Sequence, residues 1–311
     1  MTAKPRTNID FMRWRTVGLV LSTAINLAAV ASLFIQGLNL GIEFTGGTVV
    51  ELAYQEVPDL EHIRGVIKTS DFGGGTVQNF GGANNVLLRL PPSDNIAGTE
   101  AASADYTARL EKLLPGAKVR RVEFVGPQVG DELATDGIIA SLIALGGILV
   151  YVMLRFTFKF SVGAIIATVH DVMVILGFFS ISRLEFDLTA LAAVLAIMGY
   201  SLNDTIVIFD RIRENFRSIR KMPPIDVMNL SLNQTLSRTI NTHVVTSLSV
   251  FALFFFGGEL IHGFSIAFLI GIVVGTYSSI YVATASVLAL GATRQELLPI
   301  QKEGAEADKR P

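Results

Sequence analysis

The segment that decides the fold is Leu188–Phe209, LTALAAVLAIMGYSLNDTIVIF, an almost continuous apolar stretch with a carboxylate near its end. A helix needs about 20 predominantly apolar residues to cross the hydrocarbon core of a bilayer. Asp204 lies inside this stretch, about 9 Å of helix rise before the charged cluster that begins at Asp210 and Arg211. The segment therefore predicts a membrane span that carries an ionisable side chain inside the bilayer.

Five more apolar stretches predict five further spans. Half of the 311 residues are hydrophobic and 17% are charged, whereas an ordinary soluble domain has about 25% charged residues. Such a chain has more apolar surface than one soluble core can bury, so lipid is expected to be part of its solvent. The further stretches are Val17–Gln36, Ile138–Leu154, Val162–Ile181, His243–Phe256 and Phe264–Leu290.

The positive charges predict the orientation of these spans, because Lys and Arg collect on the cytoplasmic side of membrane proteins. They precede span one, fill the turn between spans two and three, and follow spans four and six, while the opposite turns hold one cation, Arg183. Both termini are therefore expected in the cytoplasm. The clustered cations are Lys4, Arg6, Arg13, Arg15, Arg155, Lys159, Arg211, Arg213, Arg217, Arg220, Lys221 and Arg294.

The segment between spans one and two is then outside, and its alternation of apolar and polar residues predicts a folded α+β domain. The order βαββαβ is a split-βαβ, ferredoxin-like pattern. Glycines 73–75 and 81–82 are interpreted as turns and not as a phosphate loop, because no Lys-Ser/Thr pair follows them. The expected strands are Thr48–Tyr54, Thr76–Phe80, Val86–Leu90 and Lys118–Val125, and the expected helices are Leu60–Lys68 and Ala101–Leu114.

The predicted fold is thus a polytopic α-helical membrane protein with six transmembrane helices and one small α+β domain. Its expected divisions are a cytoplasmic segment 1–16, a first span 17–36, an outside domain 37–131, a region 132–292 that holds spans two to six and a basic cytoplasmic loop 210–236, and a cytoplasmic tail 293–311.

Span five is the most informative segment after span four. Its apolar run His243–Phe256 would cover only about 21 Å of a core about 30 Å thick, so the preceding residues must enter the bilayer and bring Arg238 to its inner rim. An unpaired charge in a span costs about 2.5 to 3.5 kcal/mol. We therefore predict a buried Asp204–Arg238 pair, either functional or a fixed ion pair that only orients two helices. The residues expected to share one polar helix face are Thr235, Arg238, Thr242, Thr246 and Ser249.

Span three places His170 and Asp171 near its midpoint. A proton relay and a neutral acid that hydrogen-bonds a neighbouring helix are both compatible with this pair. Span six repeats a small residue at every fourth position, which predicts close packing against another helix. The repeat consists of Ala267, Gly271, Gly275, Ser279 and Ala283.

Composition and motifs also exclude several functions. A net charge of −2 gives no basic excess to meet the phosphates of a nucleic acid. The absence of cysteine rules out disulfides and thiolate chemistry. The outside domain has His62 as its single histidine and no nucleophile with a recognisable base, so we expect no catalytic residues, no enzyme activity and no metal site.

Several stretches of the chain resemble SecF, the smaller partner of SecD in bacterial protein export. The resemblance extends from span one to span six, and the span-four motif is its most specific part. One departure is Glu43, where the family commonly has Asp. The matching stretches are Asn8–Trp14, Leu40–Thr48, Val125–Pro127, Gly199–Thr205, Asp210–Asn215 and Ser237–Thr239.

The resemblance implies a resistance-nodulation-division fold in which SecF supplies one six-span half and SecD the other. It further implies a multi-pass protein of the bacterial inner membrane that assists SecYEG in moving polypeptides, driven by the proton gradient or another cation, with no other cofactor. YajC and YidC are further expected partners. The implied ion-pathway residues are Asp204, Arg238, Asn203, Asp171 and His170, and the implied family-motif residues are Glu43, Phe44, Gly46, Gly47, Asp210 and Arg211.

Two other functions remain open from the sequence. One is half of a small-molecule exporter with the same fold, for which an outside domain of about 94 residues leaves little room. The other is a structural subunit of the translocon that conducts no ion. In that case Asp204 and Arg238 would form a static clamp.

Overall fold

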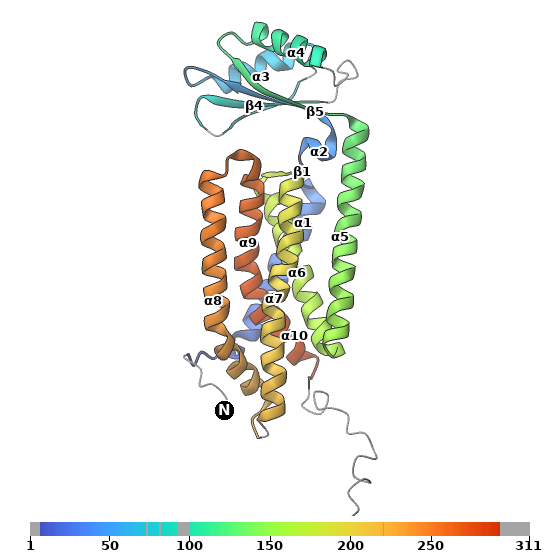
Figure 1. Cartoon of the computed structure of the whole chain (residues 1–311), viewed down its shortest axis with the longest axis vertical. Coiled ribbons are helices and arrows are strands. Elements are labelled where there is room, and N and C mark those ends of the chain that lie inside the picture. The colour runs from blue at the N-terminus through green and yellow to red at the C-terminus, as the bar shows by residue number, and fades with distance from the viewer. Residues whose placement is uncertain (1–6, 73, 81, 92–99, 220, 293–311) are drawn as a thin grey trace, which may run out of the picture.

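The computed structural model of the chain describes residues 7–72, 74–80, 82–91, 100–219 and 221–292. Long helices lie side by side in one bundle, and a small α+β domain covers one end of it (Figure 1). The predicted cytoplasmic tail 293–311, part of the predicted segment 1–16, and several predicted cations and turn glycines lie outside the described residues. These are Lys4, Arg6, Arg220, Arg294, Gly73 and Gly81.

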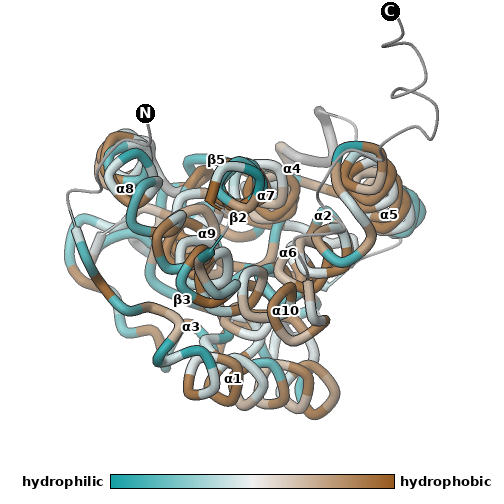
Figure 2. The backbone as a smooth tube through the Cα atoms, turned by 90° about the horizontal axis from the view of Figure 1, so that it is seen from below, coloured by the Kyte–Doolittle hydropathy of each residue, from teal (hydrophilic) through white to brown (hydrophobic). Residues whose placement is uncertain are grey.

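Six helical segments are long and apolar enough to cross a membrane, which confirms the predicted number of spans. Viewed along the bundle, hydrophobic residues dominate the helix bodies (Figure 2). The first five spans lie in α1 (Arg15–Gln36), α5 (Pro127–Arg155), α6 (Phe158–Ser182), α7 (Leu188–Ser218) and α8 (Pro224–Phe256). The sixth consists of α9 (His262–Ser278), a π-helical turn η3 (Ser279–Ala283) and α10 (Thr284–Ala289), and the short 3-10 turns are η1 (Met12–Trp14) and η2 (Glu259–Ile261).

The helices extend beyond the apolar runs, and this corrects one prediction. The expected loop 210–236 is mostly helical, because α7 continues to Ser218 and α8 begins at Pro224. Pro224 fits the first turn of a helix, where its missing N–H would have no partner. Polar residues end an apolar run without ending a helix, so hydropathy locates the membrane boundary and not the helix terminus.

Three spans form the centre of the bundle. In the 18-residue apolar segment of each span, half of the residues of α6, α7 and the sixth span are buried inside the chain. The buried share is 17% in the first span and in α8, and 6% in α5. The small-residue repeat of span six packs closely, as predicted: a Cβ on Gly275 would lie 2.8 Å from Ser201 Oγ, and one on Gly271 would meet the side chain of Ile197. Helix α9 therefore lies directly against the segment of α7 that leads to Asp204.

The outside domain has the predicted βαββαβ order. Its strands are β2 (Gly47–Ala53), β3 (Thr76–Asn79), β4 (Asn85–Leu90) and β5 (Lys118–Val125), and its helices are α3 (Leu60–Thr69) and α4 (Glu100–Leu113). The sheet is antiparallel with the order β3-β4-β2-β5.

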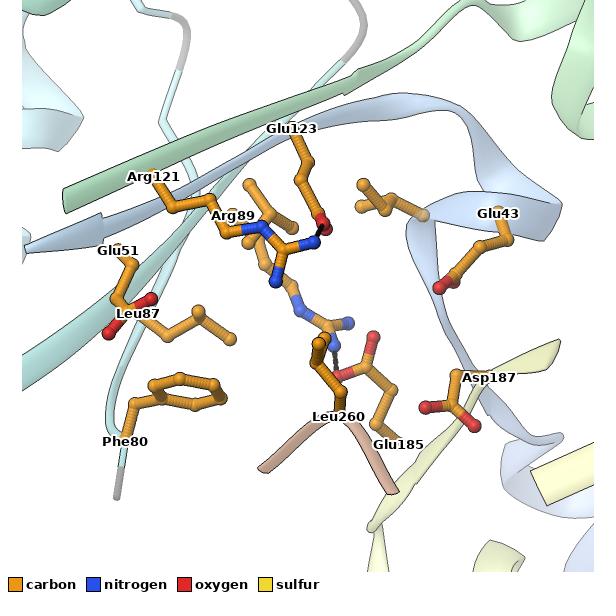
Figure 3. A pocket seen from close by; sticks show the side chains of 12 residues that line it. Glu43, Glu51, Phe80, Leu87, Arg89, Arg121, Glu123, Glu185, Asp187 and Leu260 are labelled. Carbon is orange, nitrogen blue, oxygen red and sulfur yellow. Dashed lines mark ion pairs between the residues drawn. The ribbon is translucent and has the colours of Figure 1, made fainter. Parts of the chain in front are cut away.

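The two faces of this sheet differ because successive side chains in a strand point to opposite sides. On one face, residues such as Val50, Leu52 and Leu88 are fully buried under α3 and α4. On the other face, Arg89 and Glu123 point toward the helix bundle (Figure 3). The charged face therefore meets the membrane-spanning part of the chain.

Two short elements connect the domain to the bundle. Strand β1 (Asn39–Leu40) pairs in parallel with β6 (Glu185–Phe186), the turn between α6 and α7. Helix α2 (Ile42–Thr45) follows β1, and Gly46 and Gly47 lead from it into β2. Both glycines have positive φ, +69° and +130°, and a Cβ on Gly47 would lie 2.7 Å from the carbonyl oxygen of Leu90. The glycine pair is thus required by backbone geometry.

Gly47→Ala is expected to destabilise this connection, because it combines a strained backbone with a contact to a carbonyl oxygen that cannot move away. The expected loss of unfolding free energy is about 1 to 3 kcal/mol, measured as a lower melting temperature of the purified protein. Gly65→Ala is the control, because Gly65 lies in α3 and a Cβ added to it would meet nothing within 4 Å, and alanine favours a helix interior by about 1 kcal/mol. Equal losses in both variants would contradict the prediction.

Candidate functional site

The candidate site lies where α7, α8 and α9 meet, and it consists of Asp204 and His243. His243 Nε2 lies 2.8 Å from Asp204 Oδ2. Asp204 is 5% exposed and His243 8% exposed, so both ionisable groups are buried. The two atoms are at ion-pair distance, although their angles fall outside those of a hydrogen bond. We call these two residues the Asp204–His243 pair.

A third residue fixes the other side of the imidazole. His243 Nδ1 lies 2.5 Å from the hydroxyl oxygen of Thr276 on α9. That hydroxyl donates to the carbonyl oxygen of Ile272, at 2.7 Å. The ring of Tyr200 lies 5.4 Å from the imidazole, centroid to centroid. The imidazole is therefore held on two sides, between a carboxylate and a hydroxyl.

The predicted Asp204–Arg238 pair is not formed. Arg238 is exposed, and within the described residues the basic side chain at ion-pair distance from Asp204 is that of His243. Arg238 and His243 are five residues apart on α8, which places their side chains about 140° apart around the helix axis. Because His243 faces α7, Arg238 faces away from it.

The rest of the predicted polar face of α8 also turns outward. Arg238, Thr242 and Ser249 are exposed, and only Thr235 is buried. The hydroxyl of Tyr200 reaches the edge of this face, where it donates to Thr246 Oγ1 at 3.0 Å. Asn203, the other residue expected beside Asp204, is exposed as well.

A second polar cluster lies between α6, α7 and α9, around Asp171. The hydroxyls of Ser201 and Ser278 donate to Asp171 Oδ2 at 2.5 Å and 2.9 Å. His170 Nδ1 lies 3.0 Å from the other carboxylate oxygen, and Asp171 is 1% exposed. Both carboxylate oxygens thus have partners, which is typical of a packed polar group. A role of this cluster in proton transfer stays a prediction.

Helices α7 and α9 connect the two clusters. Ser201 and Asp204 are three residues apart on α7, and this spacing places them on neighbouring positions of one helix face. One helical turn after Ser201, Thr205 Oγ1 lies 2.9 Å from Ser279 Oγ, where the π-helical turn begins. A continuous line of polar side chains therefore runs along the α7–α9 contact.

The other residues of the span-four motif lie at the end of α7 away from the outside domain. Asp210 forms an ion pair with Arg155 at the end of α5, at 2.5 Å, and Arg213 approaches it at 3.7 Å. Arg211 pairs with Glu214 on its own helix at 2.8 Å. These pairs are partly exposed to solvent, so each contributes little stability, but the Asp210–Arg155 contact joins α5 to α7.

A charged pocket lies at the junction between the outside domain and the bundle (Figure 3). Arg89 on β4 forms an ion pair with Glu185 on β6, and Asp187, next to it, caps α7 by accepting the N–H of Ala190. The sheet of the outside domain is therefore tied to the outer end of the helix that carries Asp204. We call Arg89 and Glu185 the junction pair.

The family-motif residues Glu43 and Phe44 belong to this junction. Burial raises the pKa of the Glu43 carboxyl, and the charges of Asp187 and Glu123 add to the rise, while a backbone hydrogen bond and Arg89 oppose it. Burial also lowers the pKa of the Arg89 guanidinium. Phe44 is buried and its ring stacks on that of Phe186, with 6.3 Å between the ring centroids. Helix α2 thus inserts an aromatic side chain into the top of the bundle and holds an acid above it.

The described residues contain no group of three or more His, Cys, Asp or Glu side chains that could hold a metal ion. The Asp204–His243 pair brings a carboxyl group and an imidazole together in a buried position between α7 and α8. Six spans, one small α+β domain and ionisable side chains buried between the helices place the chain in the class of polytopic membrane proteins. Ionisable groups inside spans are candidates for a functional site.

Comparison with known proteins identifies the family within that class. The family model described as "Protein export membrane protein SecD/SecF, C-terminal" matches residues 105–293, and the "SecD/SecF GG Motif" matches residues 31–56. Proteins named "Protein translocase subunit SecF" from Vibrio alginolyticus and Pseudomonas aeruginosa are each 47% identical to this chain, over 99% and 97% of its length and 98% and 97% of theirs. The chain belongs to the SecF family.

The fold agrees with this assignment. The crystal structure of SecDF from Thermus thermophilus, described as a translocon-associated membrane protein, superposes with a TM-score of 0.83 at 36% identity over 92% of this chain. The chain corresponds to 39% of that SecDF protein. The predicted fold, six spans of the resistance-nodulation-division type with a small α+β domain, is confirmed.

Proposed function

We propose that the chain is the SecF-type subunit of a bacterial protein-export machinery and that it works with SecD and the SecYEG channel. Its relatives are named as translocase subunits, and the similar SecDF protein is described as translocon-associated. In this proposal a transmembrane proton gradient drives the chain, which assists the movement of polypeptides and performs no covalent chemistry.

The observation that carries the proposal is the buried Asp204–His243 pair. A carboxylate held inside a span is costly unless a partner compensates it. Protonation of Asp204 removes its negative charge and weakens its attraction to the neighbouring helix. The contact between α7 and α8 then has two states, and the gradient sets their populations.

Helix α7 is the element that transmits this change. Asp204 lies about 26 Å of helix rise from Asp187 at the outer end of α7. At that end the junction pair joins the bundle to the sheet of the outside domain. Repacking of α7 therefore moves the outside domain, where the translocating polypeptide would be engaged.

Two of the expected ion-pathway residues take a different place in this mechanism. Arg238 and Asn203 are exposed, so neither neutralises Asp204 within this chain. We propose that they lie at the open side of the pathway. His170 and Asp171 keep a proposed role on its inner side, next to α7.

The proposed location is the bacterial inner membrane, with both termini in the cytoplasm and the outside domain in the periplasm. Described cations at the bundle end opposite that domain include Arg13, Arg15, Arg155, Lys159 and Arg213, as expected for a cytoplasmic face.

The bundle also offers surfaces for partners. Helix α5 is strongly apolar, but only 6% of its 18-residue apolar segment is buried within this chain. The polar residues of α8 are exposed although they lie in a span. We propose SecD as the partner that covers one of these surfaces and lipid as the environment of the rest, with YajC and YidC as further candidates.

Co-purification from membranes tests the assignment. An affinity tag on this chain is expected to retain a SecD-type protein at near-equal amounts, and SecY at lower amounts after mild solubilisation. Gly47→Ala is the comparison variant, because its strained contact is with Leu90 on β4 and involves neither α5 nor α8; it is expected to retain the same partners. Purification of the chain without a SecD-type partner would overturn the proposal.

A further inference from the structure

We infer that His243 is a second proton-binding residue of the coupling site and that it shares one proton with Asp204. This inference rests on the proposed function, because it assigns a residue to the regulation of the same site. The starting point is the contact of 2.8 Å between His243 Nε2 and Asp204 Oδ2.

The hydrogen bonds around Thr276 locate the protons. A hydroxyl has one proton to donate, and a backbone carbonyl only accepts. Thr276 Oγ1 lies 2.7 Å from the carbonyl oxygen of Ile272 and therefore donates its proton there. The same oxygen then accepts a hydrogen bond from His243 Nδ1, 2.5 Å away. With the hydroxyl proton directed to Ile272, we place a proton on Nδ1.

With Nδ1 protonated, a neutral imidazole would present a bare nitrogen to Asp204. A lone pair and an ionised carboxylate 2.8 Å apart repel each other, so we place a proton on Nε2, which makes this contact an ion pair. The pair therefore holds one shared proton and carries no net charge. A second proton leaves a neutral acid beside an imidazolium and removes the charge attraction between the two side chains, which weakens the contact between α7 and α8.

Few other ionisable groups of the described residues approach His243. Tyr200 lies beside the imidazole on α7, and its hydroxyl donates to Thr246. On α9 the titratable residues are His262, which packs on Phe254 at the far end, and Tyr277, which donates to the carbonyl oxygen of Gly18.

The remaining elements in contact with α8 add little. Helix α10 has no titratable residue, and η1 has Arg13, which is exposed. On α8 itself, Arg238 is exposed on another face. Within the described residues, His243 and Asp204 therefore form an isolated pair between α7 and α8.

Histidine nitrogen signals provide a direct test. The complete chain, together with its SecD-type partner, is labelled with ¹⁵N-histidine, reconstituted in lipid and studied by solid-state NMR near neutral pH. The wild-type spectrum is expected to show both nitrogens of His243 protonated, with the signal assigned by its loss in His243→Gln. In Asp204→Asn, His243 is expected to become neutral. A neutral His243 in the wild type, or no change in Asp204→Asn, would overturn the inference.

A functional test separates this inference from the proposed function. In His243→Gln a donor to Asp204 remains but cannot titrate, so the pH profile of gradient-driven export is expected to shift by about one pH unit or more. Thr276→Val should shift it in the same way, while the control His262→Gln should not.

Two results have different meanings in this test. If His243→Gln leaves the pH profile unchanged while Asp204→Asn abolishes the gradient effect, the inference fails and the proposed function stands. If Asp204→Asn has no effect either, the proposed function fails and the inference fails with it.

Discussion

Replacement of Asp204 by Asn is expected to abolish the stimulation of polypeptide export by a proton gradient. Asn is close to Asp in size but cannot bind or release a proton. A proton that crosses 100 mV gains about 2.3 kcal/mol, which biases a two-state equilibrium about 50-fold. Export by the variant in vesicles that contain SecD and SecYEG should therefore fall to the level measured without a gradient.

Two controls make this result specific. Asp226→Asn removes a carboxylate from an exposed position at the start of α8 and should leave stimulation unchanged. The Asp204→Asn protein should still insert into membranes and co-purify with its partner, because Asn can hydrogen-bond to His243. Stimulation at the wild-type level in Asp204→Asn would contradict an ion-carrying role for Asp204.

The same variant separates the proposal from a purely structural subunit. A static clamp between α7 and α8 needs a polar contact to His243, which an amide can provide about as well as a carboxylate. A clamp should therefore survive Asp204→Asn, whereas proton coupling should not.

The depth of the ionisable groups can be predicted from the sequence, and so can the order of the elements. Apolar runs locate residues along the membrane normal because each residue adds about 1.5 Å of helix. For this reason Asp204 is expected inside a span, and its burial agrees. Alternation in the outside domain likewise predicts strands close to β2 and β5.

The partner of Asp204 cannot be predicted from depth alone. Two residues at similar depth meet only if their helices are also rotated toward each other, and that rotation depends on packing. The sequence does contain a signal for His243, because Thr235, Thr239 and His243 recur at every fourth position and so share one helix face. In the structure all three are buried. The apolar run that begins at His243 obscures this signal, because hydropathy marks the residue only as the start of a span.

The junction pair is even less accessible to sequence analysis. Arg89 and Glu185 are far apart in the chain, and either would be an ordinary surface charge in a strand or a turn. Only the pairing of β1 with β6 brings the turn between α6 and α7 under the sheet. The motif around Gly46 and Gly47 indicates a constrained connection there, but not the charges above it.

Crosslinking the outside domain to the bundle is expected to stop gradient-driven export reversibly. The chain has no cysteine, so Arg89→Cys combined with Glu185→Cys introduces the only thiols of this subunit. A cleavable bis-maleimide linker at the junction pair would hold the sheet against the outer end of α7. If the outside domain must move relative to α7, export should fall to the level without a gradient and recover when the linker is cleaved.

The matched control is a second pair of cysteines within one rigid element. Glu61 and Arg64 form an ion pair three residues apart on α3, so Glu61→Cys with Arg64→Cys also replaces an ion pair and accepts the same linker. Crosslinking there holds no moving parts together and should leave export unchanged. The uncrosslinked double variants measure the effect of losing each ion pair. Full activity of the crosslinked junction would show that the proton-driven change at Asp204 reaches the polypeptide by a route other than movement of the outside domain against α7.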